Sequence, residues 1–302
     1  MDDDLPAIKV LFDAGTRAHA SYIVEVQTDR EIDWGGPKQL DPVQGYARKP
    51  DYENGSYQRE IEGLLTIGRL IREGLVQPYT STEIQFELLR GRMIDPTLNA
   101  FKGCEFAHCD SPVERSKFRS TIKIKEHCAK GGKKDKKKDL GQFTQIAFMK
   151  WLKNLSITEV AALISMQSEL KLTSNEVSSL GDLDWFQHLA MRLQSDENLP
   201  DAFHLWTARR NEMDVFVTLD RKLNNSFDSI VSERQSGISF GLEVMSPLPF
   251  LKWCGVDSID PIPIDHGVFY HYHELKCLDT KEDLTAGHER WWRRFKDFLF
   301  KQ

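Results

Sequence analysis

Apolar positions along this chain occur either in short continuous runs or at helical spacing. Ile8–Phe12 is apolar except for Lys9, as expected for a strand covered on both faces of a parallel sheet. Further strands are predicted at 75–79, before the Thr-Leu-Asp of 218–220, and at 241–245. Helical spacing predicts helices at 57–71, 143–154, 156–170 and 182–195. The alternation of strands and helices predicts an α/β fold with a mostly parallel sheet.

Three segments depart from this pattern. Residues 33–56 are rich in Gly, Pro, Asp and Asn, which predicts a long irregular loop. Residues 94–142 hold three of the five cysteines and a run of lysines, which favours an inserted module with a basic loop at its tip. The pattern of basic and aromatic residues at 284–300 predicts an amphipathic helix. The predicted organisation is a core in two parts (1–93 and 143–256), an insertion (94–142) and a C-terminal extension (257–302).

Composition narrows the function classes. The 302 residues are 40% hydrophobic and 28% charged, which is ordinary for a soluble globular protein. A net charge of -6 argues against nucleic-acid binding driven by global charge, but it leaves room for a local basic patch. There is no apolar run of roughly 18 residues, so no membrane span is predicted. The acidic N-terminus lacks the basic region of a signal peptide, and with the cysteine usage this predicts a cytoplasmic protein.

Carboxylates stand at the ends of the predicted strands. Asp13 directly follows the first strand. Asp220 follows the strand predicted before residues 218–220, so both carboxylates should lie at the same edge of a parallel sheet. Asp201 follows Pro200 at the start of a helix, where the helix dipole should keep it ionised. Glu87 lies one turn into the helix after the second strand. Parallel packing of these elements would bring the four carboxylates together.

Four ionised carboxylates repel one another strongly at low dielectric unless cations lie between them. A set of oxygen ligands indicates Mg²⁺ or Mn²⁺ rather than zinc. Such ions activate a water molecule and stabilise the transition state of phosphodiester hydrolysis.

The sequence of residues 199–223 resembles a motif of a known protein family. It reads LPDAFHLWTARRNEMDVFVTLDRKL. An Asp-Ala pair that opens a helix, followed by Asp-x-Phe-x-Thr-x-Asp, is similar to the C-terminal motif of PIN-domain ribonucleases. Three other stretches resemble further pieces of that domain, namely KVLFDAGT, YTSTEIQFELLRG and FGLEVMSPLPFLKWCGV. The resemblance covers roughly residues 6–30, 57–95 and 180–256.

The resemblance implies a three-layer α/β/α fold and a metal-dependent endoribonuclease that uses Mg²⁺ or Mn²⁺. It implies catalytic and metal-binding roles for Asp13, Glu87, Asp201 and Asp220, with Thr218 supporting Asp220. It also implies an RNA substrate, a toxin or defence effector with an inhibitor protein, and a homodimer. The alternative is a non-catalytic RNA-binding or scaffold protein with the same fold, and a DNA nuclease with the same core is a third hypothesis.

The chain departs from the family pattern in two ways. The gaps between the acidic positions are longer than in minimal members, which implies insertions. Asn224 stands where some members have a further acid, so a second metal would bind weakly, use Asp228, or lack a fourth ligand. Glu83 is the rival of Glu87 for its role. Asp214 begins a strand, so it should lie at the opposite edge and take no part.

Other polar clusters have both an ordinary and a functional interpretation. The five lysines of the insertion are either a solvated loop or an arm that contacts phosphates: Lys133, Lys134, Lys136, Lys137 and Lys138. Residues with a loose zinc-like spacing are Cys104, His108, Cys109, His127 and Cys128, although adjacent ligands share one tetrahedral site poorly. His271 and His273 are either packed or exposed side chains or a pair of ligands, and Trp291 with Trp292 either dock a helix or stack on bases.

Overall fold

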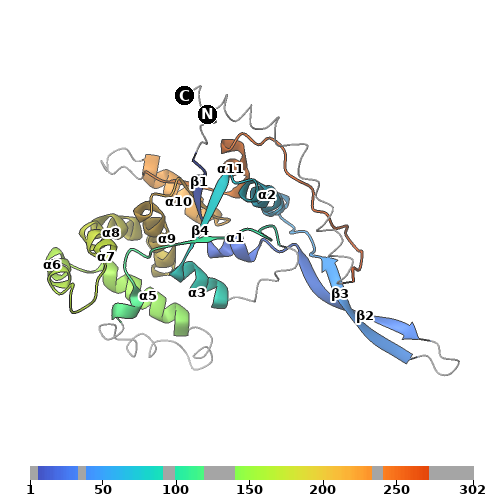
Figure 1. The fold of residues 1–302 in the computed structure, drawn as a ribbon, viewed down its shortest axis with the longest axis horizontal. Coiled ribbons are helices and arrows are strands. Elements are labelled where there is room, and N and C mark those ends of the chain that lie inside the picture. The colour runs from blue at the N-terminus through green and yellow to red at the C-terminus, as the bar shows by residue number, and fades with distance from the viewer. Residues whose placement is uncertain (1–5, 33–38, 91–98, 119–139, 233–240, 272–302) are drawn as a thin grey trace. The chain divides into compact units, whose positions relative to one another are not determined.

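The computed structural model describes residues 6–32, 39–90, 99–118, 140–232 and 241–271. The chain is an α/β protein with a five-stranded, all-parallel sheet flanked by helices, consistent with a three-layer α/β/α fold (Figure 1). The predicted fold class is therefore confirmed. Among the described helices, none is both long and apolar enough to cross a membrane.

The described elements divide between two compact units. We call residues 1–17, 76–93 and 105–245 the sheet unit, and residues 18–75, 94–104 and 246–302 the hairpin unit. The strands of the sheet unit are β1 (Ile8–Phe12), β4 (Val76–Ser81), β5 (Ala107–Cys109), β6 (Val215–Val217) and β7 (Glu243–Met245). Its helices are α3 (Thr82–Arg90), η1 (Arg115–Phe118), α5 (Leu140–Lys153), α6 (Ile157–Ser165), α7 (Ser174–Gly181), α8 (Leu183–Arg192), η2 (Asp196–Asn198), α9 (Leu199–Arg210) and α10 (Arg221–Ser232). The short helix α1 (Ala14–Ala18) follows β1, and the hairpin unit holds β2 (Ile23–Ile32), β3 (Gln39–Arg48), α2 (Gly55–Arg72) and α11 (Pro247–Trp253).

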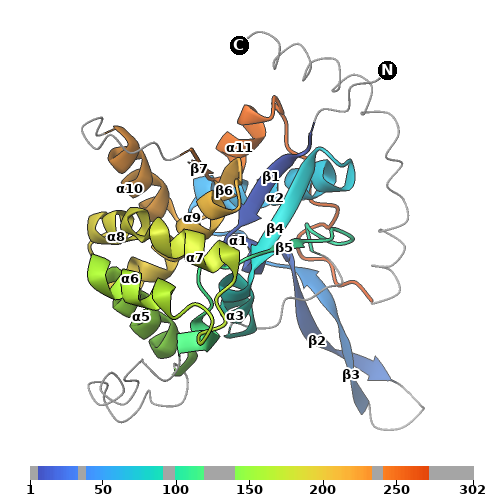
Figure 2. The same ribbon diagram turned by 60° about the vertical axis from the view of Figure 1, so that its left-hand side comes forward.

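The sheet has the order β5-β4-β1-β6-β7, and every neighbouring pair is parallel (Figure 2). Strand β1 is central, and its Phe12 pairs with Val217 of β6. The backbone N–H of Asp13 continues this ladder by donating to the carbonyl of Val217 at 3.0 Å. The prediction that the carboxyl ends of these two strands lie at one edge of the sheet is confirmed, and β1 and β6 are also neighbours.

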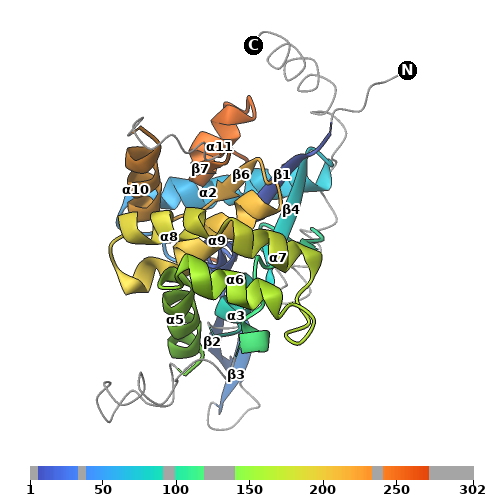
Figure 3. The same ribbon diagram turned by 90° about the vertical axis from the view of Figure 1, so that its left-hand side faces the viewer.

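Helix α9 lies in the core of the sheet unit and packs against α5 and α8 (Figure 3). Its apolar residues are buried on all sides rather than along one stripe, and Phe203 and Trp206 are fully buried. Trp206 stacks on Phe186 of α8 with ring centroids 5.3 Å apart, and Phe203 meets Phe148 of α5 edge-on at 6.2 Å. Each such ring stabilises the core by roughly 1.5–3 kcal/mol. His204, a polar side chain on this helix, is likewise fully buried.

Residues 39–48 correct one prediction, because they form strand β3 and not part of an irregular loop. This strand pairs antiparallel with β2, from Ile23 opposite Arg48 to Ile32 opposite Gln39. Pro42 and Gly45 made the segment read as a loop, yet both lie inside β3. The pairing with β2 satisfies the backbone polar groups of β3. The composition of residues 39–48 gives no information about this partner, so it did not predict a strand.

Gly68 of helix α2 allows a close backbone approach within the hairpin unit. A Cβ atom at this position would lie 1.8 Å from the carbonyl oxygen of Ala100. We expect Gly68→Ala to lower the free energy of unfolding by about 3 kcal/mol, since backbone must move to make room. Gly55→Ala is the matched control, because a Cβ there meets nothing within 4 Å. Urea unfolding of both variants checks this, and equal stabilities would contradict it.

Candidate metal centre

Asp13 is fixed between the end of β1 and the start of α1. Its Oδ2 accepts a hydrogen bond from Thr218 Oγ1 at 3.2 Å. Gly15 leaves room for the carboxylate, because a Cβ at that position would lie 3.0 Å from Asp13 Oδ2. Burial is the largest cause that raises the pKa of Asp13, and Glu87 raises it further, while His204 and Thr218 oppose the rise.

Thr218 joins two of the predicted site residues. Its side chain is fully buried at the end of β6. The hydroxyl donates to Asp13, and it accepts from the backbone N–H of Asp220 at 3.0 Å. The expectation was that Thr218 supports Asp220. In the structure it also holds Asp13, so one hydroxyl sets the positions of both strand-end residues.

Asp220 directly precedes helix α10. Its Oδ1 accepts from the backbone N–H groups of Lys222 at 2.7 Å and Leu223 at 3.1 Å, which satisfies donors that a helix start leaves free. The residue is exposed. Its charge nevertheless contributes to raising the pKa of Asp201, so the two carboxylates are neighbours. Asp220 therefore acts as a helix cap and also borders the acidic cluster.

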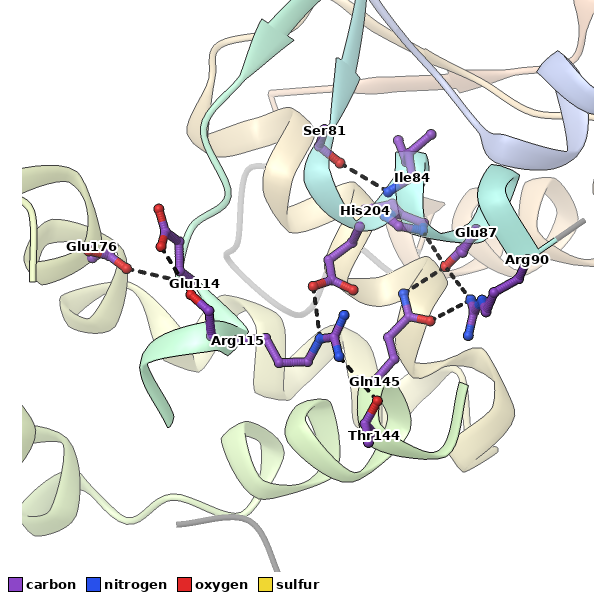
Figure 4. A network of polar contacts seen from close by, with 12 residues as sticks. Ser81, Ile84, Glu87, Arg90, Glu114, Arg115, Thr144, Gln145, Glu176 and His204 are labelled. Carbon is purple, nitrogen blue, oxygen red and sulfur yellow. Dashed lines mark hydrogen bonds and ion pairs between the residues drawn. The ribbon is translucent and has the colours of Figure 1, made fainter. Parts of the chain in front are cut away.

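Glu87 is held by three polar neighbours (Figure 4). Its Oε1 accepts from Gln145 Nε2 at 2.8 Å, lies 3.0 Å from His204 Nε2, and is 3.8 Å from the Arg90 guanidinium. Arg90 in turn donates to Gln145 Oε1 at 2.7 Å. Burial would raise the pKa of Glu87, but His204, Gln145 and Arg90 outweigh it, so the pKa is lowered on balance. Glu87 is ionised and oriented without a metal ion.

Glu83, the rival of Glu87, has a structural partner instead. Its Oε1 accepts from Arg115 Nε at 3.0 Å, and Arg115 also donates to Thr144 Oγ1 (Figure 4). The guanidinium of Arg115 lies over the ring of Phe86. Glu83 is 3% exposed, so it is a buried acid with an ion-pair partner of its own. The geometry places Glu87, and not Glu83, beside Asp13.

His204 is the site residue that sequence reasoning missed. It lies on α9 with a fully buried side chain. One of its ring nitrogens, a carboxylate oxygen of Asp13 and one of Glu87 all lie within 4.8 Å of one another. The available signal was the Asp-x-x-His spacing with Asp201, because residues three apart share one face of a helix. A carboxylate and a histidine at that spacing form a metal-ligand pattern in helical bundles.

An imidazole changes the predicted electrostatics of the cluster. Burial would lower the pKa of His204, but Glu87, Asp13 and Asp201 raise it to about 9. At neutral pH the ring is therefore cationic in the metal-free protein, and it offsets part of the carboxylate charge. The predicted set of oxygen ligands did not include this nitrogen, which lies in the same cluster.

Asp201 corrects a second expectation. It lies in the first turn of α9, where the helix dipole was expected to keep it ionised. Burial and the charges of Asp13, Asp220 and Glu87 instead raise its pKa to about 7. Burial and like charge together exceed a dipole effect that is typically below 1 kcal/mol.

The residues present fit a bound cation. The Asp13, Glu87 and His204 cluster could hold a metal ion. Two buried polar atoms, His204 Nδ1 within the cluster and Asn224 Oδ1 on α10, have no hydrogen-bond partner within the described part of the chain. Asn224 lies one turn after Asp220 and donates Nδ2 to the Thr218 carbonyl at 3.5 Å. A surplus of acids together with unpaired buried polar atoms is what an ion would satisfy.

Other predicted residues lie apart from this cluster or outside the described residues. Asp214 accepts from the backbone N–H of Lys9 at 2.8 Å at the start of β6, which confirms that it lies at the opposite edge. Asp228 is exposed on α10 and joins no metal-holding group among the residues with described positions. The lysines of the insertion lie outside the described residues, as do His127, Cys128, His273, Trp291 and Trp292.

The described residues of the zinc-like set have ordinary surroundings. Cys109 is buried, which raises the pKa of its thiol to about 12. His108 Nε2 lies 3.3 Å from Thr82 Oγ1. The thiol of Cys104 donates to the Gly68 carbonyl. Over the ranges that the structure describes, these three residues form no metal-holding group. The exposed His271 packs its ring against Phe269.

The fold and the site together define an α/β protein with a carboxylate and imidazole cluster at the carboxyl edge of a parallel sheet. The chain matched nothing in comparisons with protein-family models, curated proteins and solved structures.

Proposed function

We propose that this protein is a metal-dependent endoribonuclease of the PIN type, which hydrolyses RNA phosphodiester bonds with Mg²⁺ or Mn²⁺ at this cluster. The observation that supports it is the convergence of acids from distant segments. Asp13, Glu87 and Asp201 come from the first strand, the second strand–helix pair and α9, and their charges influence one another. These are the positions that the sequence motifs resembled.

Each residue has a role in this proposal. A bound ion supplies an activated water and positive charge for the transition state. Asp13 and Glu87 hold the ion, and Asp201 and Asp220 add negative charge around it. Thr218 and Gln145 orient the ligands Asp13 and Glu87 through the hydrogen bonds described above. Such orientation by neighbouring groups commonly affects metal affinity 10–100-fold.

A non-catalytic RNA-binding scaffold is the second candidate. The observation that favours it is the cationic His204, because this ring already offsets part of the acidic charge without a metal ion. The biological setting implied by the resemblance, a toxin or defence effector with an inhibitor protein, is part of the first proposal only.

Cleavage of a mixed RNA pool tests the proposal. We expect internal cleavage with Mn²⁺ or Mg²⁺ and none with EDTA, because the acids alone supply no activated water. A single-stranded DNA pool of the same lengths tests the DNA nuclease hypothesis. Tight RNA binding without cleavage under any metal condition would contradict the enzyme and support the scaffold.

A further inference from the structure

Arg17 lies one helical turn after Asp13, on α1. Its backbone N–H donates to the Asp13 carbonyl at 3.1 Å. The side chain is half-buried, and its terminal nitrogen donates to Thr80 Oγ1 at 3.0 Å. The guanidinium carbon lies 4.2 Å from the centroid of the Phe106 ring, which is a favourable cation–π position. Two neighbours thus fix where this cation points.

This arginine differs from the other inward-facing arginines of the sheet unit, because no described carboxylate lies within ion-pair distance of it. Arg90 is paired with Glu87, and Arg115 is paired with Glu83. Burial lowers the pKa of Arg17 with no carboxylate opposing it. The group stays charged at any physiological pH. A half-buried charge without a counter-ion costs free energy, which an external anion would recover.

The position of Arg17 relates it to the acidic cluster. Leu11 of β1 pairs with Tyr79 of β4, and the next residue of β4 is Thr80. Thr80 and Asp13 therefore stand at the same carboxyl edge of the sheet, with α1 beside them (Figure 2). The guanidinium of Arg17 is held by Thr80 and Phe106 and not by a carboxylate of the cluster. An anion bound by Arg17 would therefore lie at the same edge of the sheet as the cluster, but outside the contacts that join Asp13, Glu87 and His204.

We propose that Arg17 binds a phosphate of the RNA strand adjacent to the phosphate cleaved at the metal centre. The proposal rests on the function proposed above and names a substrate subsite of the same edge. A guanidinium matches a phosphate with two parallel hydrogen bonds, and one nitrogen bonded to Thr80 leaves the others available. A polyanion approaching an acidic cluster on a protein of net charge -6 needs a fixed cation of this kind.

Salt-dependent RNA binding tests the subsite. The protein would carry Asp201→Asn to prevent cleavage, and a labelled single-stranded RNA would be titrated in Mn²⁺ by fluorescence anisotropy at several salt concentrations. We expect Arg17→Met to weaken binding about tenfold at low salt, as for the loss of a charged hydrogen bond. The log–log salt slope should fall by about 0.7, the value for one lost phosphate contact on a single strand.

Two further variants separate charge from packing. Arg17→Lys keeps the charge, so it should keep the salt slope while losing some affinity, because it cannot form the paired hydrogen bonds. Arg192→Met makes the same change at an exposed position of α8 and should alter neither quantity. In the cleavage-competent protein, Arg17→Met should raise KM and leave kcat nearly unchanged, since the contact is with a non-reacting phosphate.

The possible failures are distinguishable. The Arg17→Met variant could have the same melting temperature and the same log–log salt slope of RNA binding as its parent. In that case the arginine does not contact a phosphate and the subsite is wrong. The function proposed above would survive that result. If the parent protein, in which Arg17 is intact, binds no RNA at any salt or metal concentration, both the subsite and the proposed function are wrong.

Discussion

Asp13→Asn is expected to lower the rate of RNA cleavage by about 10³-fold or more while the protein remains folded. The change removes one negative oxygen and keeps nearly the same shape, so the bound ion loses a ligand. Losing an ion removes the activated water and several kcal/mol of transition-state stabilisation. Without metal the variant should be as stable as the wild type or more stable, because burial and Glu87 raise the pKa of this carboxyl.

Asp201→Asn should behave in the same way, and the double variant should be little slower than either single variant, because both residues serve one ion. Asp184→Asn is the matched control: Asp184 is exposed in the first turn of α8, as Asp201 stands in the first turn of α9. The control should cleave normally. Cleavage rates and melting temperatures with and without Mn²⁺ provide the measurement, and near wild-type cleavage by Asp13→Asn would rule out the ribonuclease.

The second large effect concerns the stability of the metal-free protein as a function of pH. The pKa of Asp201 is raised from 3.8 to about 7, so the folded state binds its proton more tightly than the unfolded state. This group therefore destabilises the fold progressively as pH rises from about 4 to about 7. The pKa of His204 is raised from 6.5 to about 9, so its stabilising charge is complete below pH 6.5 and is lost as pH rises towards 9.

Unfolding measured in EDTA across pH 4.5–9 checks both parts. Relative to Asp201→Asn, the wild type should lose about 3 kcal/mol between pH 4.5 and 7, since each pKa unit corresponds to roughly 1.4 kcal/mol. His204→Gln should abolish the further decline at higher pH. It should also be the least stable variant at pH 6, because the ionised carboxylates then lack their cation. Added Mn²⁺ should stabilise the wild type most at high pH, where the ligands are deprotonated. Parallel pH profiles for the wild type and Asp201→Asn would contradict the argument.

The strand-end acids were predictable because a parallel sheet brings its carboxyl ends to one edge. Asp13 and Asp220 each follow an apolar run, and that local pattern is sufficient. The choice between Glu83 and Glu87 was not predictable. The two lie one turn apart on α3, and their partners Arg115 and Gln145 come from elements more than thirty residues away. For His204 the Asp-x-x-His spacing with Asp201 was a local signal, but the contact that brings it into the cluster is with Glu87 on another helix.

The pKa of Asp201 shows a different limit of sequence reasoning. The position in the first turn of a helix is readable from Pro200, and it correctly placed the residue at the start of α9. The number of buried charges around the carboxyl depends on how the segments pack. Likewise, β3 could not be predicted from its own composition, because its hydrogen bonds go to β2.

The burial of α9 on every side has a consequence for ion choice. Asp201 and His204 both project from a helix whose rings are interlocked with α5 and α8, so neither can shift without disturbing that core. If the cluster binds an ion as proposed, side chains that cannot shift would distinguish ions by radius, because they would not follow a larger ion outward. On the proposed function, we therefore expect Mg²⁺ or Mn²⁺ to support cleavage and Ca²⁺, with its longer bonds, to be a poor substitute even at high concentration.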